Sequence, residues 1–166
     1  MKSLIVCYSY HHRNTQKVAE AMAEVLDSEP RAPQQINPDD LLSFDLVGFG
    51  SGIYSYQHDV SLFDLLDKLP QVPGKKAFIF STTGTPIAFG EPALAKALEQ
   101  HIPLRKKIQS KGYVILGEFI CAGYNTNKFL KYFGGINKGR PNEEDLKHAE
   151  EFALKLRLEI ERESRV

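Results

Sequence analysis

A polar stretch between a strand-like run and a helix-like run is the first place where this chain could do chemistry. The stretch runs from Ser9 to Thr15 and holds hydroxyl groups, two imidazoles, a guanidinium and an amide. It follows the apolar run Leu4–Tyr8 and leads into an amphipathic segment, so it enters the N-terminus of a helix. Helix N-termini present unpaired N–H groups and favour negative charge. The sequence therefore predicts an anion site, and we expect the anion to be a phosphate group.

Three more polar loops follow strand-like runs in the same way. They are rich in glycine, hydroxyl groups and tyrosine, and they span Gly52–His58, Thr82–Pro86 and Ala122–Thr126. In an open parallel sheet the carboxyl ends of the strands share one edge, and ligands bind there beside the point where the strand order reverses. Four such loops at one edge exceed what loop composition alone predicts. They are the strongest functional signal in the chain.

The elements that must position these loops alternate along the chain between strand and helix. This alternation predicts an α/β fold, a doubly wound open parallel sheet of five strands in the order 2-1-3-4-5 with helices on both faces. We expect one domain over residues 1–166. The expected strands are Leu4–Tyr8, a short edge strand at Gln34–Asn37, Phe44–Ser51, Lys76–Ser81 and Tyr113–Cys121. The glycines of the third strand allow close backbone approach.

The expected helices carry recognisable caps. Asn14 or Thr15 caps a first helix that ends near Leu26, Asp59 caps the second, and Asn142 with Asp145 caps the last. Pro92 suits a first helical position, and Pro38–Leu42 is a turn or a helical turn. The inward-facing positions are Val18, Met22, Val25, Leu26, Leu62, Phe63, Leu66, Leu69, Leu94, Ala97, Leu98, Leu146, Ala149, Ala153, Leu156 and Ile160.

Composition excludes several classes of protein. The chain has 21 basic and 21 acidic residues, which argues against binding to nucleic acid or an anionic membrane through overall positive charge. Cys7 and Cys121 lie in apolar runs, so we expect them to be reduced, and no His/Cys cluster suggests a metal site. The N-terminal apolar run is too short for a signal peptide, and no segment approaches a membrane span. We expect a cytoplasmic protein.

Flavin mononucleotide (FMN) is the ligand that these loops suit. Its phosphate needs N–H and O–H donors, its ring system needs flat walls, and its pyrimidine edge needs backbone or amide hydrogen bonds. Ser9, Asn14 and Thr15 offer donors to the phosphate, and Tyr54 and Tyr56 offer aromatic walls. The same residues also have explanations without a ligand. The polar residues could form a capped turn, and the tyrosines could pack against the protein.

The remaining loop residues divide in the same way. Thr82, Thr83 and Gly84 could bond the pyrimidine edge or form a tight turn before a helix, and Phe89 closes that side or packs in the core. Each of the residues from His11 to Arg13 either faces the phosphate or points into water, and water is favoured for Arg13.

A rival interpretation reads the spacing from Cys7 to Arg13 as C-x5-R, the pattern of a tyrosine phosphatase loop. There a thiolate attacks phosphorus while the arginine and the loop amides hold the phosphoryl group. The intervening Tyr8–His12 has no glycine, Asn14 follows the arginine in place of a hydroxyl residue, and the chain has no Asp-Pro pair to supply a general acid. A phospho-receiver domain is excluded because no acidic residue ends the first strand.

With the loops laid out, the whole chain resembles the flavodoxin-like family of FMN proteins. Tyr8-Ser9 and Asn14–Ala19 are similar to the family's first loop, commonly Ser-x-Thr-Gly-Asn-Thr followed by Lys and Val-Ala; Phe44–Ser51 is similar to its third strand, and Phe80–Thr85 to the loop that meets the flavin ring. Residues 11–13 stand in place of the usual Thr-Gly, so this loop is one residue longer than the family's pattern. The resemblance implies that Ser9, His11, Asn14 and Thr15 bind phosphate and that Tyr54, Thr82, Thr83 and Gly84 meet the ring.

The candidate cofactor-binding set combines the loop analysis and the resemblance. It comprises Ser9, Tyr10, His11, His12, Asn14, Thr15, Ile53, Tyr54, Thr82, Thr83, Gly84 and Thr85. No residue is nominated as catalytic or as a metal ligand, because the redox chemistry belongs to the flavin.

The resemblance implies electron transfer, or flavin-dependent reduction of a small acceptor such as a quinone. Electron-transfer flavodoxins are typically acidic whereas this chain is neutral, which favours the reductase role. The expected partner is a redox protein or a small electron acceptor. The alternatives are the phosphatase and a flavin-free interaction module. The aromatic and basic stretch Lys128–Arg140 is a lid, a docking surface or, as we favour here, a covering loop.

Overall fold

A twisted parallel β-sheet forms the centre of the molecule in the computed structural model, which describes residues 1–86 and 90–164. Its strands are β1 (Ser3–Tyr8), β2 (Pro30–Arg31), β3 (Leu46–Gly52), β4 (Lys76–Thr83) and β5 (Val114–Ala122). They lie in the order β2-β1-β3-β4-β5, and all neighbours are parallel. The predicted fold class and strand order are confirmed.

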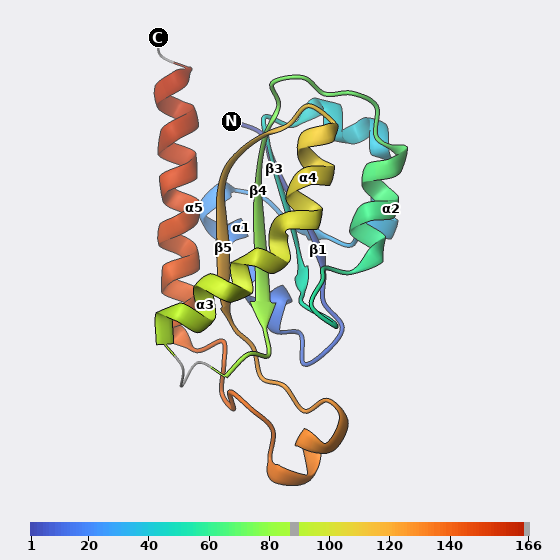
Figure 1. The fold of residues 1–166 in the computed structure, drawn as a ribbon. Helices are drawn as coiled ribbons and strands as arrows, with labels where there is room; N and C mark the ends of the chain where they lie inside the picture. Colours follow the sequence, from blue (N-terminus) through green and yellow to red (C-terminus); the bar gives the residue numbers. More distant parts are fainter. Residues whose placement is uncertain (87–89, 165–166) are drawn as a thin grey trace.

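Helices cover both faces of this sheet (Figure 1). On one face lie α1 (Asn14–Leu26) and α5 (Glu143–Glu163), and on the other lie α2 (Val60–Lys68) and α4 (Ile102–Ser110). Helix α4 follows α3 (Gly90–Leu98), to which the 3₁₀ turn η4 (Glu99–His101) joins it. Other 3₁₀ turns in the described part of the chain are η1 (Pro33–Gln35), η2 (Pro38–Ser43) and η5 (Lys128–Phe133). Within the described residues, no helix combines the length and apolar character needed to cross a membrane.

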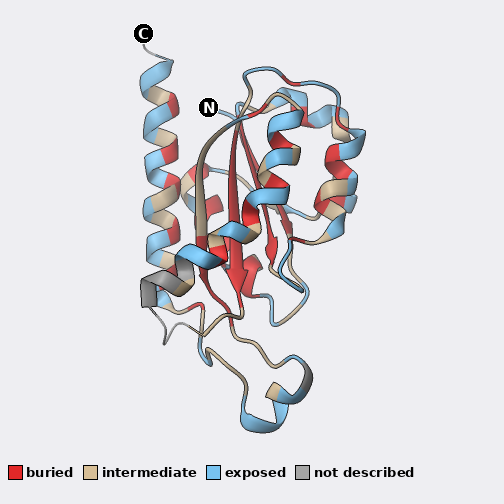
Figure 2. Ribbon diagram, in the orientation of Figure 1, coloured by how far each residue is buried: buried red, intermediate tan, exposed pale blue. Residues whose placement is uncertain are grey.

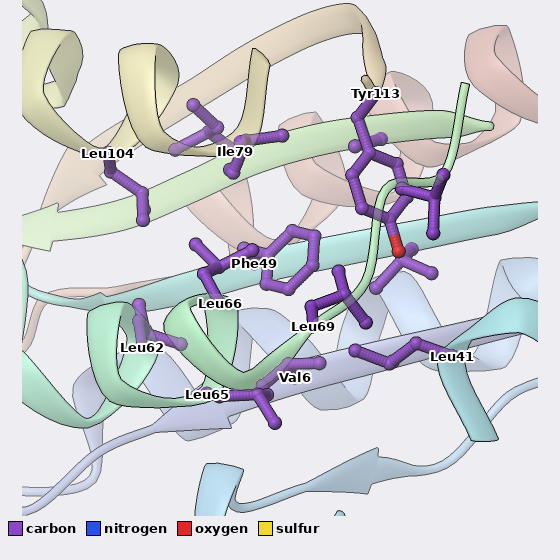
Figure 3. Close-up of a cluster of buried hydrophobic side chains, with 14 of the residues drawn as sticks. Val6, Leu41, Phe49, Leu62, Leu65, Leu66, Leu69, Ile79, Leu104 and Tyr113 are labelled. Atoms are coloured by element: carbon purple, nitrogen blue, oxygen red, sulfur yellow. The ribbon is translucent and has the colours of Figure 1, made fainter. Parts of the chain in front are cut away.

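Each face of the sheet has its own apolar core, because side chains alternate along every strand. Val6, Phe49 and Ile79 point toward α2 and α4, where Figure 3 shows them packed with Leu62, Leu66 and Leu104. The intervening positions, among them Ile5, Phe78 and Phe80, pack against α1 and α5. The central strands are therefore buried on both faces, as their colour in Figure 2 shows.

Aromatic rings from β4 fill the space beside two glycines of β3, Gly48 and Gly50. A methyl group at Gly48 would overlap the ring of Phe78, and one at Gly50 would overlap the ring of Phe80. The close approach that the sequence predicted at these glycines is therefore made by side chains of the neighbouring strand. These rings lie in the core beneath α1 and α5.

Two local predictions at the start of the chain are wrong. The edge strand is Pro30–Arg31, paired with Ile5 and Val6, while the expected strand at Gln34–Asn37 overlaps the turn η1, in which the Gln35 side chain accepts a hydrogen bond from the Ala32 N–H. Proline suits this place because an edge strand does not need every N–H. Helix α1 begins without a side-chain cap after Arg13, since the side chains of Asn14 and Thr15 bond elsewhere.

The predictions for the later helices hold better. Asp59 accepts from Ser61 N, and Asn142 and Asp145 form a reciprocal capping box. Helix α3 begins at Gly90, two residues before the proline expected at its first position. Phe89 and the side chains of Pro92 and Leu94 lie outside the described part of the chain.

The contact between Gly50 and Phe80 predicts a measurable coupling. Gly50→Ala should lower the free energy of unfolding by roughly 1–3 kcal/mol, because the added methyl overpacks a filled core. Combining it with Phe80→Leu should cost less than the sum of the two single changes, since the smaller side chain relieves the overlap. Urea denaturation of the four proteins checks this, and strictly additive losses would contradict it.

Candidate functional site

A small pocket of about 30 Å³ opens at the carboxyl edge of the sheet, where the strand order reverses between β1 and β3. This volume is far below the roughly 300–1,000 Å³ of small-molecule sites, so a ligand larger than a few atoms would need the surrounding loops to move apart. All four polar loops predicted from the sequence contribute to its wall. The lining residues are His11, Asn14, Gly52, Ile53, Tyr54, Thr82, Thr83, Gly84, Gly123, Tyr124, Asn125 and Asn127.

The first loop makes its turn with non-glycine residues in a strained conformation. His12 and Arg13 both have φ of 53°, in the left-handed region that glycine adopts most easily. This is the segment where the sequence departs from the family's Thr-Gly. The Arg13 side chain is 72% exposed and lies 3.6 Å from Glu20, so it points away from the pocket into water, as predicted.

The first residues of α1 connect three loops. Asn14 is buried and donates from Nδ2 to the carbonyl oxygen of Tyr124 at 2.9 Å. Thr15 is also buried, and its hydroxyl lies 2.8 Å from that of Thr82 at the end of β4. Both residues are at the predicted site, but their side chains bind loop to loop. Gly123 makes the approach to Asn14 possible, because a Cβ there would lie 2.9 Å from Asn14 Nδ2.

Two buried polar atoms of the first loop and helix remain without a partner among the described residues. They are the hydroxyl oxygen of Ser9 and Oδ1 of Asn14. Unpartnered buried polar groups are costly and call for an explanation. A ligand carrying both acceptor oxygens and N–H donors would satisfy them. The Ser9 hydroxyl at the entrance to α1 suits a phosphate, so the residues present fit the phosphate end of FMN.

The two histidines of the first loop turn toward the loop after β5. His11 Nε2 accepts from Thr126 N at 3.3 Å, and His12 Nε2 lies 2.7 Å from Thr126 Oγ1. Partial burial and the neighbouring His12 lower the pKa of His11. His11 lines the pocket. His12 does not, but the centroid of its ring lies 4.6 Å from that of Tyr124, which does.

The loop after β3 reaches across to the first loop through Tyr54. The Tyr54 hydroxyl accepts from Tyr10 N at 3.5 Å, and the two rings lie 5.8 Å apart. Burial raises the pKa of Tyr54, an effect partly offset by the N–H groups of Tyr10 and His11. Ile53 donates from its N–H to Thr82 O at 2.9 Å. Ile53 and Tyr54 line the pocket, while Tyr10 is exposed at its rim.

The end of β4 and the residue after it contribute to the pocket. Thr82, Thr83 and Gly84 line it, whereas Thr85 does not, and its N–H donates to Thr83 Oγ1 at 3.2 Å. A methyl group at Gly84 would overlap the side chain of Asn125. The glycine therefore lets the loop after β5 close over the pocket.

The structure separates the twelve candidate residues into two groups. Seven line the pocket: His11, Asn14, Ile53, Tyr54, Thr82, Thr83 and Gly84. The other five, Ser9, Tyr10, His12, Thr15 and Thr85, are outside the lining set; Ser9 keeps its unpartnered hydroxyl, and the rest bond or stack with other loop residues.

Five lining residues are absent from the candidate set, although the first four lie in loops that the sequence predicts at this edge: Gly52, Gly123, Tyr124, Asn125 and Asn127. Four of them belong to the loop after β5 or directly follow it. The signal for this loop was its place at the same edge of the sheet, but no single residue in it had a type that pointed to a role. Its closeness to the pocket depends on Gly84 and Asn14, which are distant in sequence.

The geometry does not suit the phosphatase interpretation. Cys7 is buried, and burial together with the charge of Glu20 raises the pKa of its thiol to about 12, which disfavours the nucleophilic thiolate. Arg13, which would hold the phosphoryl group, is directed toward Glu20 at the surface. Cys121 is likewise buried, and both cysteines are free thiols, as predicted.

A cluster of buried polar side chains lies directly behind the pocket, on the face covered by α2 and α4. Ser51 Oγ lies 3.0 Å from His58 Nδ1, and Ser81 Oγ lies 2.6 Å from His101 Nε2. His101 Nδ1 lies 3.0 Å from a carboxylate oxygen of Glu118, which also pairs with Arg105. Ser51 and Ser81 immediately precede the lining residues Gly52 and Thr82. The cluster therefore holds the ends of β3 and β4 in place.

The pKa values of two side chains in this cluster, His58 and Glu118, are strongly shifted. Burial and, second, the nearby His101 lower the pKa of His58 to about 3, although Glu118 acts the other way. Burial alone would raise the pKa of Glu118, but hydrogen bonds from Arg105 and His101 lower it to about 2. His58 is therefore neutral and Glu118 ionised near neutral pH.

Comparison with known proteins places the chain in a family. A family model described as a flavodoxin domain matches residues 5–128. The chain belongs to the flavodoxin domain family. A protein of Methanocaldococcus jannaschii that is described as uncharacterised is 47% identical over 153 residues, which is 92% of this chain and 96% of that protein. The resemblance drawn from the sequence is thus confirmed.

Solved structures support the same fold. A flavodoxin from the domain Archaea superimposes with a TM-score of 0.66 at 16% identity, covering 97% of this chain and 99% of that one. An NADPH-quinone reductase from P. pentosaceus superimposes with a TM-score of 0.63 at 16% identity, covering 92% and 98%. At these identities the likeness shows the flavodoxin fold.

The buried His58 predicts a loss of stability in mild acid. The unfolded chain takes up a proton on this residue below about pH 6.5 whereas the folded chain does so only near pH 3, so the free energy of unfolding falls as the pH drops between these values. From about pH 7 to about pH 5 the loss from this one group should be about 2 kcal/mol. His58→Asn should remove that part of the loss, as measured by urea denaturation at both pH values.

The control for this measurement is His148→Asn on the exposed face of α5. It should leave the dependence of stability on pH as it is in the unmodified protein. An equal dependence in the His58 variant would show that the buried histidine does not control acid stability.

Proposed function

We propose that this flavodoxin-family protein binds FMN non-covalently at the carboxyl edge of its sheet. It passes electrons between the flavin and a redox partner protein or a small acceptor such as a quinone. When bound, the flavin supplies the redox chemistry, and the protein supplies binding, orientation and electrostatics. The proposal treats the whole chain, residues 1–166, as one functional domain.

The observation that carries this proposal is the pair of buried, unpartnered atoms around the start of α1: the hydroxyl of Ser9 in the loop that leads into the helix, and Oδ1 of Asn14 in the wall of the pocket. A helix N-terminus favours an anion, and a buried hydroxyl without a partner gives that anion a donor. Family membership independently supports a flavin, since flavodoxin domains generally bind one.

The residues of the pocket take distinct roles in this proposal. Ser9 and the backbone of the first loop hold the phosphate, assisted by His11. Tyr54 and Tyr124, which both line the pocket, provide aromatic walls. Thr82–Gly84 and Asn125 offer hydroxyl, amide and backbone groups to the polar edge of the ring. The loop after β5 excludes water from one side, because its Tyr124 carbonyl is tied down by Asn14.

The proposal is tested by adding FMN to the purified protein. We expect a yellow complex with one FMN per chain, detected by visible absorbance and by quenching of FMN fluorescence. Riboflavin, which lacks the phosphate, should bind at least about tenfold more weakly, corresponding to about 1.4 kcal/mol. A protein that stays colourless with excess FMN would refute the proposal.

Replacing Asn14 by Asp should weaken FMN binding by at least about tenfold, because it places a like charge near the phosphate. Asn14→Ala removes the bond to Tyr124 without adding charge, so the difference between the two variants isolates the electrostatic effect. FMN fluorescence titration measures both affinities.

Asn37→Asp is the matched control for this change, since Asn37 caps η2 on another part of the molecule and aspartate caps equally well. It should bind FMN as the unmodified protein does. Equal affinities of the Asn14→Asp and Asn14→Ala variants would show that Asn14 is not near the phosphate.

A further inference from the structure

The segment between β5 and α5 forms an arm that extends beyond the carboxyl edge of the sheet (Figure 1). We call residues 123–142 the arm. Its outgoing and returning segments are joined at the base by backbone hydrogen bonds. Tyr124 N donates to Arg140 O at 3.0 Å, and Asn125 and Ile136 exchange two hydrogen bonds of 2.9 and 2.8 Å. Asn137 Nδ2 also donates to Thr85 O at 2.9 Å. The arm is thus a hydrogen-bonded structure anchored to the pocket.

The tip of the arm exposes three aromatic side chains. Phe129, Tyr132 and Phe133 lie in and around the 3₁₀ turn η5 and are 64%, 77% and 81% exposed. The covering loop expected for Lys128–Arg140 would turn such residues inward. The residues of the arm that line the pocket, among them Tyr124, Asn125 and Asn127, precede that stretch. Clustered exposed aromatic residues are typical of surfaces that bind a partner.

The arm is also basic within a chain of zero net charge. From Phe119 to Asn142 the sequence has four basic residues, Lys128, Lys131, Lys138 and Arg140, and no acidic one. Arg140 is paired with Asp145, while Lys131 and Lys138 are on the exposed side of the arm. Lys131 lies in the same turn as the aromatic residues, with its Nζ 5.0 Å from the centroid of the Tyr132 ring, so the tip carries positive charge.

We propose that the arm docks an acidic electron-carrier protein beside the flavin pocket. The positive charge of the arm selects an acidic surface, the exposed aromatic residues provide the apolar contact, and the continuity of the arm with the pocket wall brings the partner's redox centre close to the ring. The choice of an electron carrier, though not that of an acidic protein, rests on the proposed flavin function.

A protein surface fits these observations better than a lipid surface. Of the arm's basic side chains that the structure describes, only Lys131 and Lys138 are exposed, fewer than the roughly four to eight basic residues typical of segments that bind anionic lipid. The turn η5 has six residues and is too short to present an amphipathic helical face. A convex protein surface can contact the tip of the arm alone.

The test uses a plant-type [2Fe–2S] ferredoxin as the acidic carrier and cytochrome c as its basic counterpart. Binding of the purified protein to each is measured by biolayer interferometry at about 50 mM and about 500 mM NaCl. We expect saturable binding to the ferredoxin, weakened at least about tenfold by the higher salt, and none to cytochrome c. The combined variant Phe129→Ser, Tyr132→Ser and Phe133→Ser should lose at least about tenfold in affinity, and so should Lys131→Glu with Lys138→Glu.

The control variant is Leu154→Ser with Leu158→Ser, which removes apolar side chains of 47% and 50% exposure from α5. It should bind the ferredoxin as the unmodified protein does. Circular dichroism and FMN titration of all variants establish that the fold and the pocket are intact. A flavin site that fails in the unmodified protein would overturn the proposed function while leaving ferredoxin binding to decide the docking surface.

Two results would overturn the docking proposal. One is ferredoxin binding that is absent, or that the arm variants leave unchanged. The other is saturable binding to vesicles of anionic phospholipid that the aromatic variant abolishes, with no binding to ferredoxin, which would assign the arm to a membrane surface.

Discussion

The parallel pairing of β3 between β1 and β4 is the constraint on which the site depends. Tyr8 at the end of β1 is level with Ser51, and Gly52 at the end of β3 is level with Thr82. Because the strands end at the same height, the loops that follow them must share one edge. A shift of register by one residue would exchange the faces on which Ser81 and Thr82 lie, and would so remove Ser81 from the buried cluster and Thr82 from the pocket.

The loops at this edge are fixed by polar side chains that would otherwise be expensive to bury. Asn14 and Thr15 at the start of α1 bond to Tyr124 and Thr82, and behind the sheet end Ser51 bonds to His58 and Ser81 to His101. Each such bond contributes modestly to stability, but leaving one of these groups unpaired would cost more. This arrangement holds the pocket wall rigidly, while leaving Ser9 Oγ and Asn14 Oδ1 for a ligand.

Sequence reasoning predicts the parts of this structure that have a periodic or repeated signal. The long buried strands and the caps at Asp59 and Asn142 are examples, because burial on two faces and helix capping restrict residue type locally. The strand Pro30–Arg31 has only two residues and no period to detect. Asn14 and Thr15 have the right types for a cap, yet their partners Tyr124 and Thr82 are distant in sequence. The contribution of Asn125 and Asn127 to the pocket is invisible for the same reason.

The central claim is that the four loops at this edge form one FMN site with the phosphate at the entrance to α1. Amide NMR spectra recorded during titration of the protein with FMN test it most directly. The account predicts shifts that saturate at one equivalent and that are confined to residues of the four loops, with those around Ser9 to Thr15 lost when riboflavin replaces FMN. Shifts at the opposite edge of the sheet, or no shifts in the first loop, would contradict it.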